Sequence, residues 1–211
     1  MRIFSNLAVS LDGKIAEAAN PTKALGTAAD RREMKRLRSL ADALVVGSRT
    51  LSLMPGPVIR TGRPLIHVVL SRSGNLTSHH PLWEDDRVLK IVCVPKTAQS
   101  RARTQCRDRA LILACGESEL DLWAVVQELK KRGIKNLLVE GGGEIIGAFL
   151  KENLLQEMFV TWTPWALGSG DSVSLTGSAA LRPWVKFQVL RAKKVKDEVY
   201  FHLKVRGARR V

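Results

Sequence analysis

The sequence has no apolar run near the roughly 20 residues that cross a bilayer as a helix, although 45% of its 211 residues are hydrophobic. Its start, Met1–Phe4, leads directly into a strand-like segment and carries no signal-peptide core. These absences predict a cytoplasmic protein. The length suits one α/β domain, and no repeat or low-complexity linker divides it, so we expect residues 1–211 to form a single domain.

Cysteine is scarce: Cys93, Cys106 and Cys115 are the three present, and none stands in a CxxC pair. An odd number without that spacing indicates neither a disulfide framework nor a zinc site. His79 and His80 have no third ligand nearby, so a polar loop is the better interpretation of that pair. The sequence therefore predicts no metal.

Acidic residues are also few, since 20 Asp and Glu stand against 34 Lys and Arg, a formal charge of +14. Such an excess implies anionic partners, either phosphorylated small molecules or nucleic acid, unless it is only a solvated surface. The five tryptophans are not interleaved with basic residues as in a single-strand platform, which disfavours nucleic acid. Much of the excess lies near the C-terminus, at Lys186, Arg191, Lys193, Lys194, Lys196, Lys204, Arg206, Arg209 and Arg210.

Apolar, β-branched runs bounded by turn residues predict strands at 3–9, 43–46, 65–70, 88–94, 110–114, 136–139 and 158–162. Helical spacing predicts helices at 29–40, at 119–132 and after the glycines at 141–143. The segments 187–195 and 198–205 read as a hairpin. This order predicts a three-layer α/β/α sandwich whose central sheet is mostly parallel and ends in an antiparallel hairpin.

A strand that runs through Val139 and Glu140 into Gly141, Gly142 and Gly143 and then into a helix is typical of an anion cradle. Glycines let backbone N–H groups approach a phosphate, and the helix N-terminus adds positive potential. The spacing is not GxGxxG, and no acidic residue ends the following strand, so a Rossmann dinucleotide site is disfavoured. A plain tight turn is the competing interpretation.

The first strand ends in Asn6, Ala8, Ser10, Asp12 and Lys14, with one residue between each of them. An amide, a hydroxyl, a carboxylate and an amine thus follow one strand closely. Glu140 ends its own strand at the edge where ligands bind in open α/β sheets. A helix N-terminal acid near the dipole is the competing interpretation.

Together, Asn-x-Ala-x-Ser-x-Asp-Gly-Lys near the start and Val-Glu-Gly-Gly near the end resemble the reductase domain of the riboflavin-biosynthesis deaminase/reductase family. The resemblance is collinear over nearly the whole chain and includes Gly26-Thr27, 41–47, Thr50, and Pro164 with Gly168. It implies the dihydrofolate-reductase-like fold and a homodimer. It also implies reduction of 5-amino-6-(5-phosphoribosylamino)uracil to the ribitylamino compound by hydride transfer from NADPH to the sugar C1.

The same resemblance implies the site residues. NADPH would contact Ala8, Thr50, Ser71, Arg72, Gly141, Gly142, Gly143, Glu144, Ile145 and Gly147. The substrate would contact Asn6, Thr22, Arg38, Arg60 and Glu140, and the catalytic candidates are Glu140, Asp12 and Lys14. Arg72 would bind the 2′-phosphate of NADPH, since a guanidinium makes bidentate contacts to phosphate.

One segment departs from the family pattern. Where the family carries acids before a proline and an arginine, this chain has Leu53 and Met54 before Pro55 and Arg60. A same-fold NADPH reductase of another pterin-like or carbonyl substrate is therefore an alternative, because a site built around polar groups rejects ligands that lack the partner. A basic nucleic-acid-binding protein is a second alternative. The zinc signature HxE with PCxxC is absent from the sequence, so we expect the deaminase step in another protein.

Overall fold

The structure is a computed structural model that describes residues 1–211 except 18–19, 21, 60–63, 169 and 209–211. The chain forms two compact units. Unit 1 is built on Ala41–Leu137, and unit 2 combines Arg2–Leu40 with Leu138–Arg210. Strand β7 (Asn136–Val139) contains the residue at which the two units are divided.

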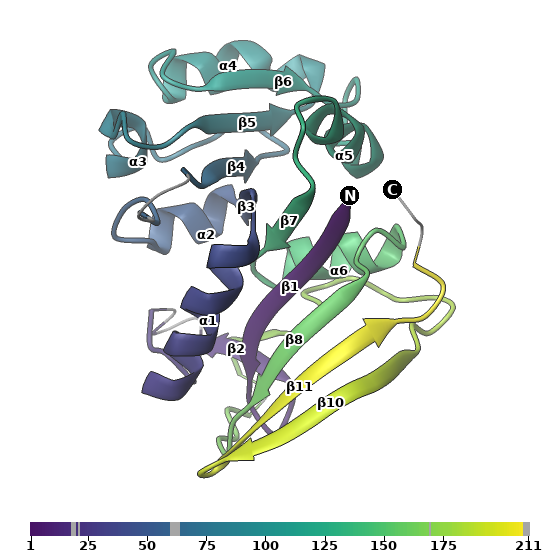
Figure 1. Ribbon diagram of the computed structural model, residues 1–211. Coiled ribbons are helices and arrows are strands. Elements are labelled where there is room, and N and C mark those ends of the chain that lie inside the picture. The colour runs from purple at the N-terminus through teal and green to yellow at the C-terminus, as the bar shows by residue number, and fades with distance from the viewer. Residues whose placement is uncertain (18–19, 21, 60–63, 169, 209–211) are drawn as a thin grey trace. The chain divides into compact units, whose positions relative to one another are not determined.

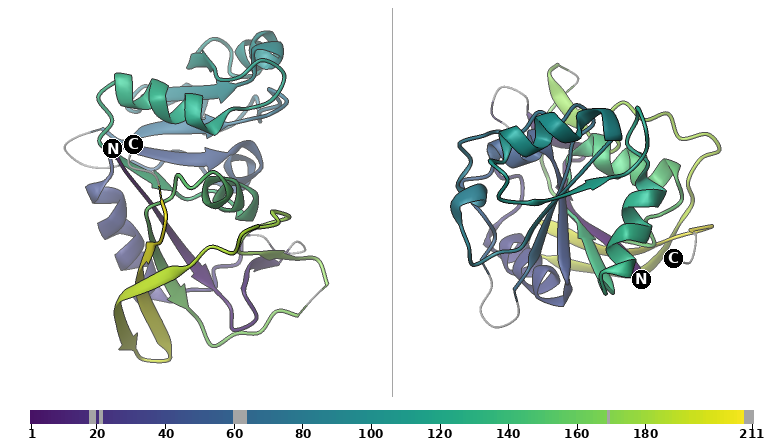
Figure 2. Two further views of the ribbon diagram at one scale, coloured as in Figure 1. Left: turned by 90° about the vertical axis from the view of Figure 1, so that its right-hand side faces the viewer. Right: turned by 90° about the horizontal axis from the view of Figure 1, so that it is seen from above.

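Unit 1 alternates strands with helices. Its strands β3, β4, β5 and β6 are parallel and neighbour one another in that order, and helices lie on either side of them (Figure 2). All five residues of β3 are buried, as expected for a parallel strand covered on both faces. The elements are β3 (Ala43–Gly47), α2 (Ser48–Leu53), β4 (Ile66–Leu70), α3 (Pro81–Glu84), β5 (Lys90–Val94), the 3₁₀ helix η1 (Lys96–Ala98), α4 (Gln99–Gln105), β6 (Leu111–Ala114) and α5 (Leu122–Lys131).

Unit 2 is organised around β8, which pairs in parallel with β1 and antiparallel with β11. The long β10–β11 hairpin completes the strand order β10, β11, β8, β1 (Figure 1). Two short strands, β2 and β9, pair separately. The elements are β1 (Arg2–Val9), β2 (Lys14–Glu17), α1 (Ala28–Leu40), α6 (Gly143–Lys151), β8 (Glu157–Trp162), β9 (Ser172–Ser174), β10 (Phe187–Val195) and β11 (Glu198–Val205).

The long helices follow from their apolar spacing. In α5, Leu122, Val125, Val126 and Leu129 are all buried, on the face that the i, i+3, i+4, i+7 pattern predicts. The helix begins at Leu122 rather than at 119, because the Asp121 carboxylate accepts hydrogen bonds from the backbone N–H groups of residues 123 and 124 and caps the N-terminus there. It ends before Gly133, whose φ is +80°.

Several short elements were not predicted. Helix α4 buries Ala102 among polar neighbours, so it has no apolar stripe to detect. Helix α3 begins at Pro81 and is capped by His80, whose Nδ1 accepts from the N–H of Leu82 at 3.0 Å. The expected polar loop at 79–80 thus ends in a helix cap. Strands β2 and β9 have three or four residues each, too few for a period to show.

The fold class predicted from the sequence is confirmed: the sheet strands are mostly parallel, and the hairpin has the predicted boundaries. All three cysteines are buried. Within the described residues, no helix is long and apolar enough to cross a membrane.

The glycines at the start of α6 permit close packing inside unit 2. A Cβ at Gly143 would overlap the carbonyl oxygen of Ser174 and lie 2.5 Å from the backbone N of Gly177. A Cβ at Gly147 would overlap the carbonyl oxygen of Thr176 and lie 2.6 Å from the Cβ of Ala179. Segment 174–179 can therefore pack directly on α6 only because these two positions lack side chains.

This packing predicts the sign of a stability change. Alanine normally stabilises a helix relative to glycine by about 1 kcal/mol. We expect Gly147→Ala to destabilise the protein instead, by roughly 1–3 kcal/mol, because the methyl group forces segment 174–179 away. Urea unfolding measures the change. Gly170→Ala, where no atom lies within 4 Å of the added Cβ, is the control and should change stability little. A stabilised Gly147→Ala protein would contradict the prediction.

Candidate functional site

The motif at the end of β1 folds into a tight turn. Ser10 is buried, and its backbone N–H donates to the carbonyl of Lys14 at 2.8 Å. Its Oγ accepts from the N–H of Lys14 at 2.8 Å and donates to the Asp12 carboxylate at 2.6 Å. Gly13 supplies the positive φ, +77°, that this turn requires. The Ser, Asp, Gly and Lys of the motif thus each have a defined place in one turn.

Asp12 links this turn to a distant segment of unit 2. Its carboxylate accepts hydrogen bonds from the backbone N–H of Leu167 at 3.1 Å and of Gly168 at 2.7 Å. The N–H of Leu11 also donates to the carbonyl of Trp165 at 2.7 Å. Because both carboxylate oxygens are used in this way, Asp12 acts in this structure as a positioning residue for segment 165–168.

Arg38 of α1 and Glu140, directly after β7, form a bidentate ion pair in unit 2. Arg38 Nε donates to Glu140 Oε1 at 2.9 Å, and Nη2 donates to Oε2 at 2.6 Å. Their side chains are 20% and 10% exposed, so the pair is largely shielded from water. Such a fork geometry fixes both side chains, and loss of one partner leaves a shielded charge uncompensated. Both residues were predicted from the resemblance as substrate contacts, and the structure brings them together.

The glycine loop follows Glu140 directly and leads into α6. Gly142 is the residue before the helix, with φ −61° and ψ 175°, and has no side chain to cap it. No positive φ occurs at residues 141–143, so a turn that needs glycine for its dihedral angles does not explain them. The acid in the first turn, Glu144, accepts from Ser178 N at 2.8 Å and from Ser178 Oγ at 2.9 Å. The N-terminus of α6 thus has no side-chain cap, and the acid in its first turn is bonded to Ser178. Both features leave the positive end of the helix suited to an anion.

In unit 1, Thr50, Ser71 and Arg72 lie at one edge of the sheet. Thr50 is in α2, which starts directly after β3, and Ser71 and Arg72 directly follow β4. The register pairs Gly47 with Leu70, so these two strands end side by side. Ser71 is buried and its Oγ donates to the carbonyl of Asn75 at 3.1 Å, whereas Arg72 is exposed.

The remaining predicted residues are dispersed. Asn6 is 9% exposed on β1, and Ala8 follows it on the same face of the strand. Thr22 is exposed, and Arg60 lies outside the described residues. Of the two residues that replace the family's acids, Leu53 is 40% exposed and Met54 is half-buried.

One polar cluster in the structure was not predicted from the sequence. Glu198 is 2% exposed and accepts from Thr27 N at 2.7 Å, Thr27 Oγ1 at 2.8 Å and Tyr200 Oη at 2.8 Å. Burial, and then the bond to Glu198, raise the pKa of Tyr200. Burial also raises the pKa of nearby Asp30, whose Oδ1 is buried without a hydrogen-bond partner. An acid inside a strongly basic stretch was the signal that could have identified Glu198.

Comparison with known proteins places these features in a family. The sequence profile of the RibD C-terminal domain matches residues 2–201. The chain belongs to the RibD C-terminal domain family. The family that the two motifs predicted is thereby confirmed.

Two relatives in the RibD C-terminal domain family match over most of their own length, and both are named 2,5-diamino-6-ribosylamino-4(3H)-pyrimidinone 5′-phosphate reductase. The protein from Archaeoglobus fulgidus is 29% identical over 81% of this chain and 83% of its own length. The one from Methanothermobacter thermautotrophicus is 25% identical over 97% of this chain and 98% of its own.

Solved structures show the same fold. The structure of Acinetobacter baumannii RibD matches 97% of this chain with a TM-score of 0.78 and 22% identity. The chain spans 58% of that RibD chain. At this identity the likeness supports the dihydrofolate-reductase-like fold of the RibD C-terminal domain family and nothing finer.

The Asp12 turn makes a prediction about pH. The Ser10 hydroxyl, followed by the Leu167 amide, lowers the pKa of Asp12 to about 2. A lowered pKa means that the charged carboxylate is favoured by folding, so its stabilising effect is present above the ordinary pKa and is lost as the pH falls through about 2. We expect carboxyl NMR to give a titration midpoint near 2 in the wild type and a higher one in Ser10→Ala. Equal midpoints would contradict the assignment of the shift to Ser10.

Proposed function

We propose that this chain is an NADPH-dependent reductase of riboflavin biosynthesis. Its proposed reaction converts 5-amino-6-(5-phosphoribosylamino)uracil to 5-amino-6-(5-phosphoribitylamino)uracil. A hydride adds to the sugar C1, the bond from C1 to the ring oxygen breaks, and that oxygen takes up a proton. The observation that carries the proposal is the family match over residues 2–201 together with the Arg38–Glu140 pair directly before the glycine loop.

The cofactor supplies the hydride when it is bound. The residues present fit such a group, because α6 starts at a glycine without a side-chain cap and its first-turn acid is turned to Ser178. Gly141 to Gly147 would hold the pyrophosphate. Ser71 and Arg72 would hold the adenosine 2′-phosphate, which distinguishes NADPH from NADH.

Arg38 and Glu140 would act on the substrate side. Arg38 is the cation for an anionic substrate group, and Glu140 accepts hydrogen bonds from the sugar or positions a proton close to it. The pair with Glu140 engages Nε and Nη2 of Arg38. Because a guanidinium has five N–H donors, Arg38 can contact a substrate anion while it stays bonded to Glu140. Asp12 would act indirectly, because its carboxylate holds segment 165–168 beside the turn that follows β1. Homodimer formation and a cytoplasmic location stay predictions.

A second candidate substrate is 2,5-diamino-6-ribosylamino-4(3H)-pyrimidinone 5′-phosphate. The two relatives matched over 83% and 98% of their own length are named as its reductases. The two compounds differ at one ring position, an amino group against an oxygen, and both carry the same ribose phosphate. The same Arg38 and Glu140 contacts would therefore serve either compound.

The test is steady-state oxidation of NADPH with each of these two substrates, for the wild type and for Glu140→Gln. We expect the wild type to turn over the uracil compound with the higher kcat/KM. Glu140→Gln should lower kcat by at least about tenfold and leave the Kd of NADPH within about twofold.

The control for this variant is Glu33→Gln, which breaks a bidentate but more exposed pair with Arg36 on the same helix, at 2.6 and 2.8 Å. It should leave kcat unchanged. Binding of NADPH without oxidation in the presence of either compound would exclude the proposed reaction. Loss of NADPH binding in Glu140→Gln would show instead that Glu140 supports the glycine loop.

Arg72 makes the cofactor part of the proposal testable. We expect the wild type to prefer NADPH to NADH, and Arg72→Ala to reduce the ratio of the two kcat/KM values by roughly 10-fold or more, since a charge-assisted contact to phosphate contributes about 1.5–3 kcal/mol. Arg101→Ala, an exposed arginine whose guanidinium donates to the Ser73 carbonyl, is the control and should keep the ratio. An unchanged ratio in Arg72→Ala would remove Arg72 from the proposed cofactor site.

A further inference from the structure

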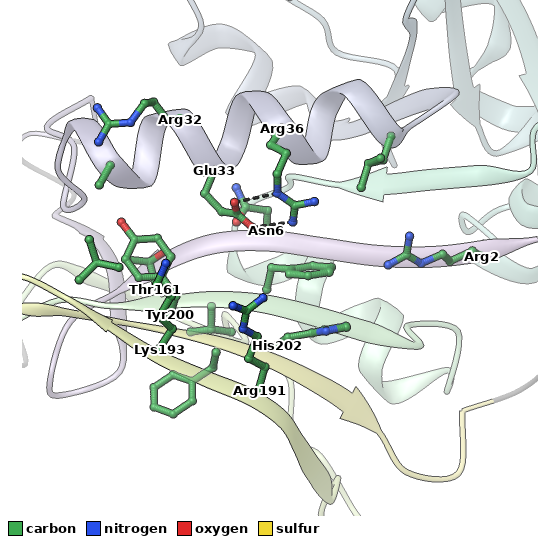
Figure 3. A pocket seen from close by; sticks show the side chains of 16 residues that line it. Arg2, Asn6, Arg32, Glu33, Arg36, Thr161, Arg191, Lys193, Tyr200 and His202 are labelled. Atoms are coloured by element: carbon green, nitrogen blue, oxygen red, sulfur yellow. Dashed lines mark hydrogen bonds and ion pairs between the residues drawn. The ribbon is translucent and has the colours of Figure 1, made fainter.

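A groove of about 750 Å³ lies within unit 2, on the side of its sheet that α1 partly covers (Figure 3). One flank of α1, with Ala29, Glu33, Arg36 and Leu40, forms one wall. The strands β1, β8, β11 and β10 form the floor and the other wall. A volume of this size is typical of sites for small molecules.

The register of the strands explains which side chains meet on the floor. Arg191 of β10 pairs with His202 of β11, His202 with Phe159 of β8, and Phe159 with Asn6 of β1. Neighbouring residues in such a row share one face of the sheet. The His202 and Phe159 rings are stacked, with centroids 4.3 Å apart and an interplanar angle of 12°. The row thus consists of a cation, two flat rings and an amide.

The next row on the same face adds a second cation and a hydroxyl. Lys193 pairs with Tyr200, and Tyr200 with Thr161. Arg191 and Lys193 are two residues apart, and Arg36 reaches toward them from α1 across the groove (Figure 3). The hydrogen bonds from Arg36 lower the pKa of Glu33, and the charges of Arg191 and Lys193 lower it further, which places both cations close to this carboxylate.

The groove carries an excess of positive charge. Its lining holds Arg2, Arg32, Arg36, Arg191 and Lys193 against one carboxylate, Glu33. Glu33 is paired with Arg36, and Arg2 is paired with Glu157. Across the residues that the structure describes, no carboxylate forms an ion pair with Arg191 or Lys193.

We propose that this groove binds a phosphorylated ring compound of about the size of a nucleotide, at a site separate from the reductase site. Arg191, Lys193 and Arg36 take the phosphate, for which convergent cations are the usual partners. The stacked His202 and Phe159 rings and the Tyr200 ring provide flat surfaces for the ring. Asn6 offers a donor and an acceptor to its polar edge.

Separation from the reductase site follows from helix geometry. Residues two apart on a helix do not share a face, and Arg38, which pairs with Glu140, is two residues from Arg36, which lines the groove. Neither Glu140 nor any residue of the glycine loop contributes to the lining. Asn6 lines the floor of the groove. Two independent sites therefore require that the reductase substrate does not use the Asn6 side chain, which the resemblance predicted as a substrate contact.

Other occupants fit less well. A second copy of the chain would bring a second cationic face to the groove, where like charges repel. A nucleic acid strand needs phosphate contacts along an extended track, whereas Arg191 and Lys193 are only roughly 7 Å apart along β10. A compact anion satisfies this spacing.

The test is calorimetric titration of the whole protein with guanosine 5′-monophosphate, with and without excess NADP⁺. We expect binding in both conditions, and at least tenfold weaker binding of inorganic phosphate or of guanosine. The double variant Arg191→Ser, Lys193→Ser should weaken nucleotide binding at least tenfold and leave NADP⁺ binding unchanged.

The matched control is Lys194→Ser, Arg206→Ser, which removes the same charge from two exposed residues outside the groove lining. It should stay within about twofold of the wild type. Equal losses in both double variants, displacement of the nucleotide by NADP⁺ or by the proposed substrate, or a dimer that disappears in the groove variant would each overturn the proposal. The readout is binding, so a protein that binds the nucleotide but reduces neither substrate would refute the proposed function alone.

Discussion

The register of β8 is the constraint on which unit 2 depends. This strand pairs in parallel with β1 on one side and antiparallel with β11 on the other. A slip by one residue would turn every side chain of β8 to the opposite face, because the side-chain period of a strand is two residues. It would move Phe159 off the face that it shares with Asn6 and His202. It would also shift the end of β8 relative to Leu11 and Asp12, which bond to segment 165–168 from the turn after β1.

The second organising feature is the close approach of backbone to the start of α6. Gly143 and Gly147 have no room for a Cβ, because segment 174–179 lies directly against them. The glycines therefore have a packing role that is independent of any phosphate. The two roles are compatible, since packing uses the helix face at Gly143 and Gly147 while an anion would use the N–H groups at the helix end. The Arg38–Glu140 pair fixes the residue just before this loop.

Much of the fold could be predicted from the sequence, and the reasons are local. Helix α5 has an apolar stripe with helical spacing, β3 is a short apolar run, and the two strands at 187–205 flank a turn. Each of these signals is visible in the sequence. Short elements such as β9 and α4 could not be predicted, because contacts with their packing partners determine where they form. The same limit holds for the site: motifs identified Glu140 and Arg38, but their mutual ion pair requires α1 and β7 to be brought together in space. The stacked Phe159 and His202 rings, 43 residues apart in sequence, depend wholly on strand register.

The link from Asp12 to segment 165–168 has a consequence for which substitutions the chain can accept. The partners of Asp12 are the backbone N–H groups of Leu167 and Gly168, and Leu11 likewise bonds the carbonyl of Trp165. Every residue except proline has the N–H group that Leu167 contributes, and every residue has the carbonyl that Trp165 contributes. The side chains at 165 and 167 can therefore change in related proteins without loss of these hydrogen bonds. Asp12 itself has no such freedom, because only a short side chain with two acceptor oxygens can bond Ser10 and both amides at once.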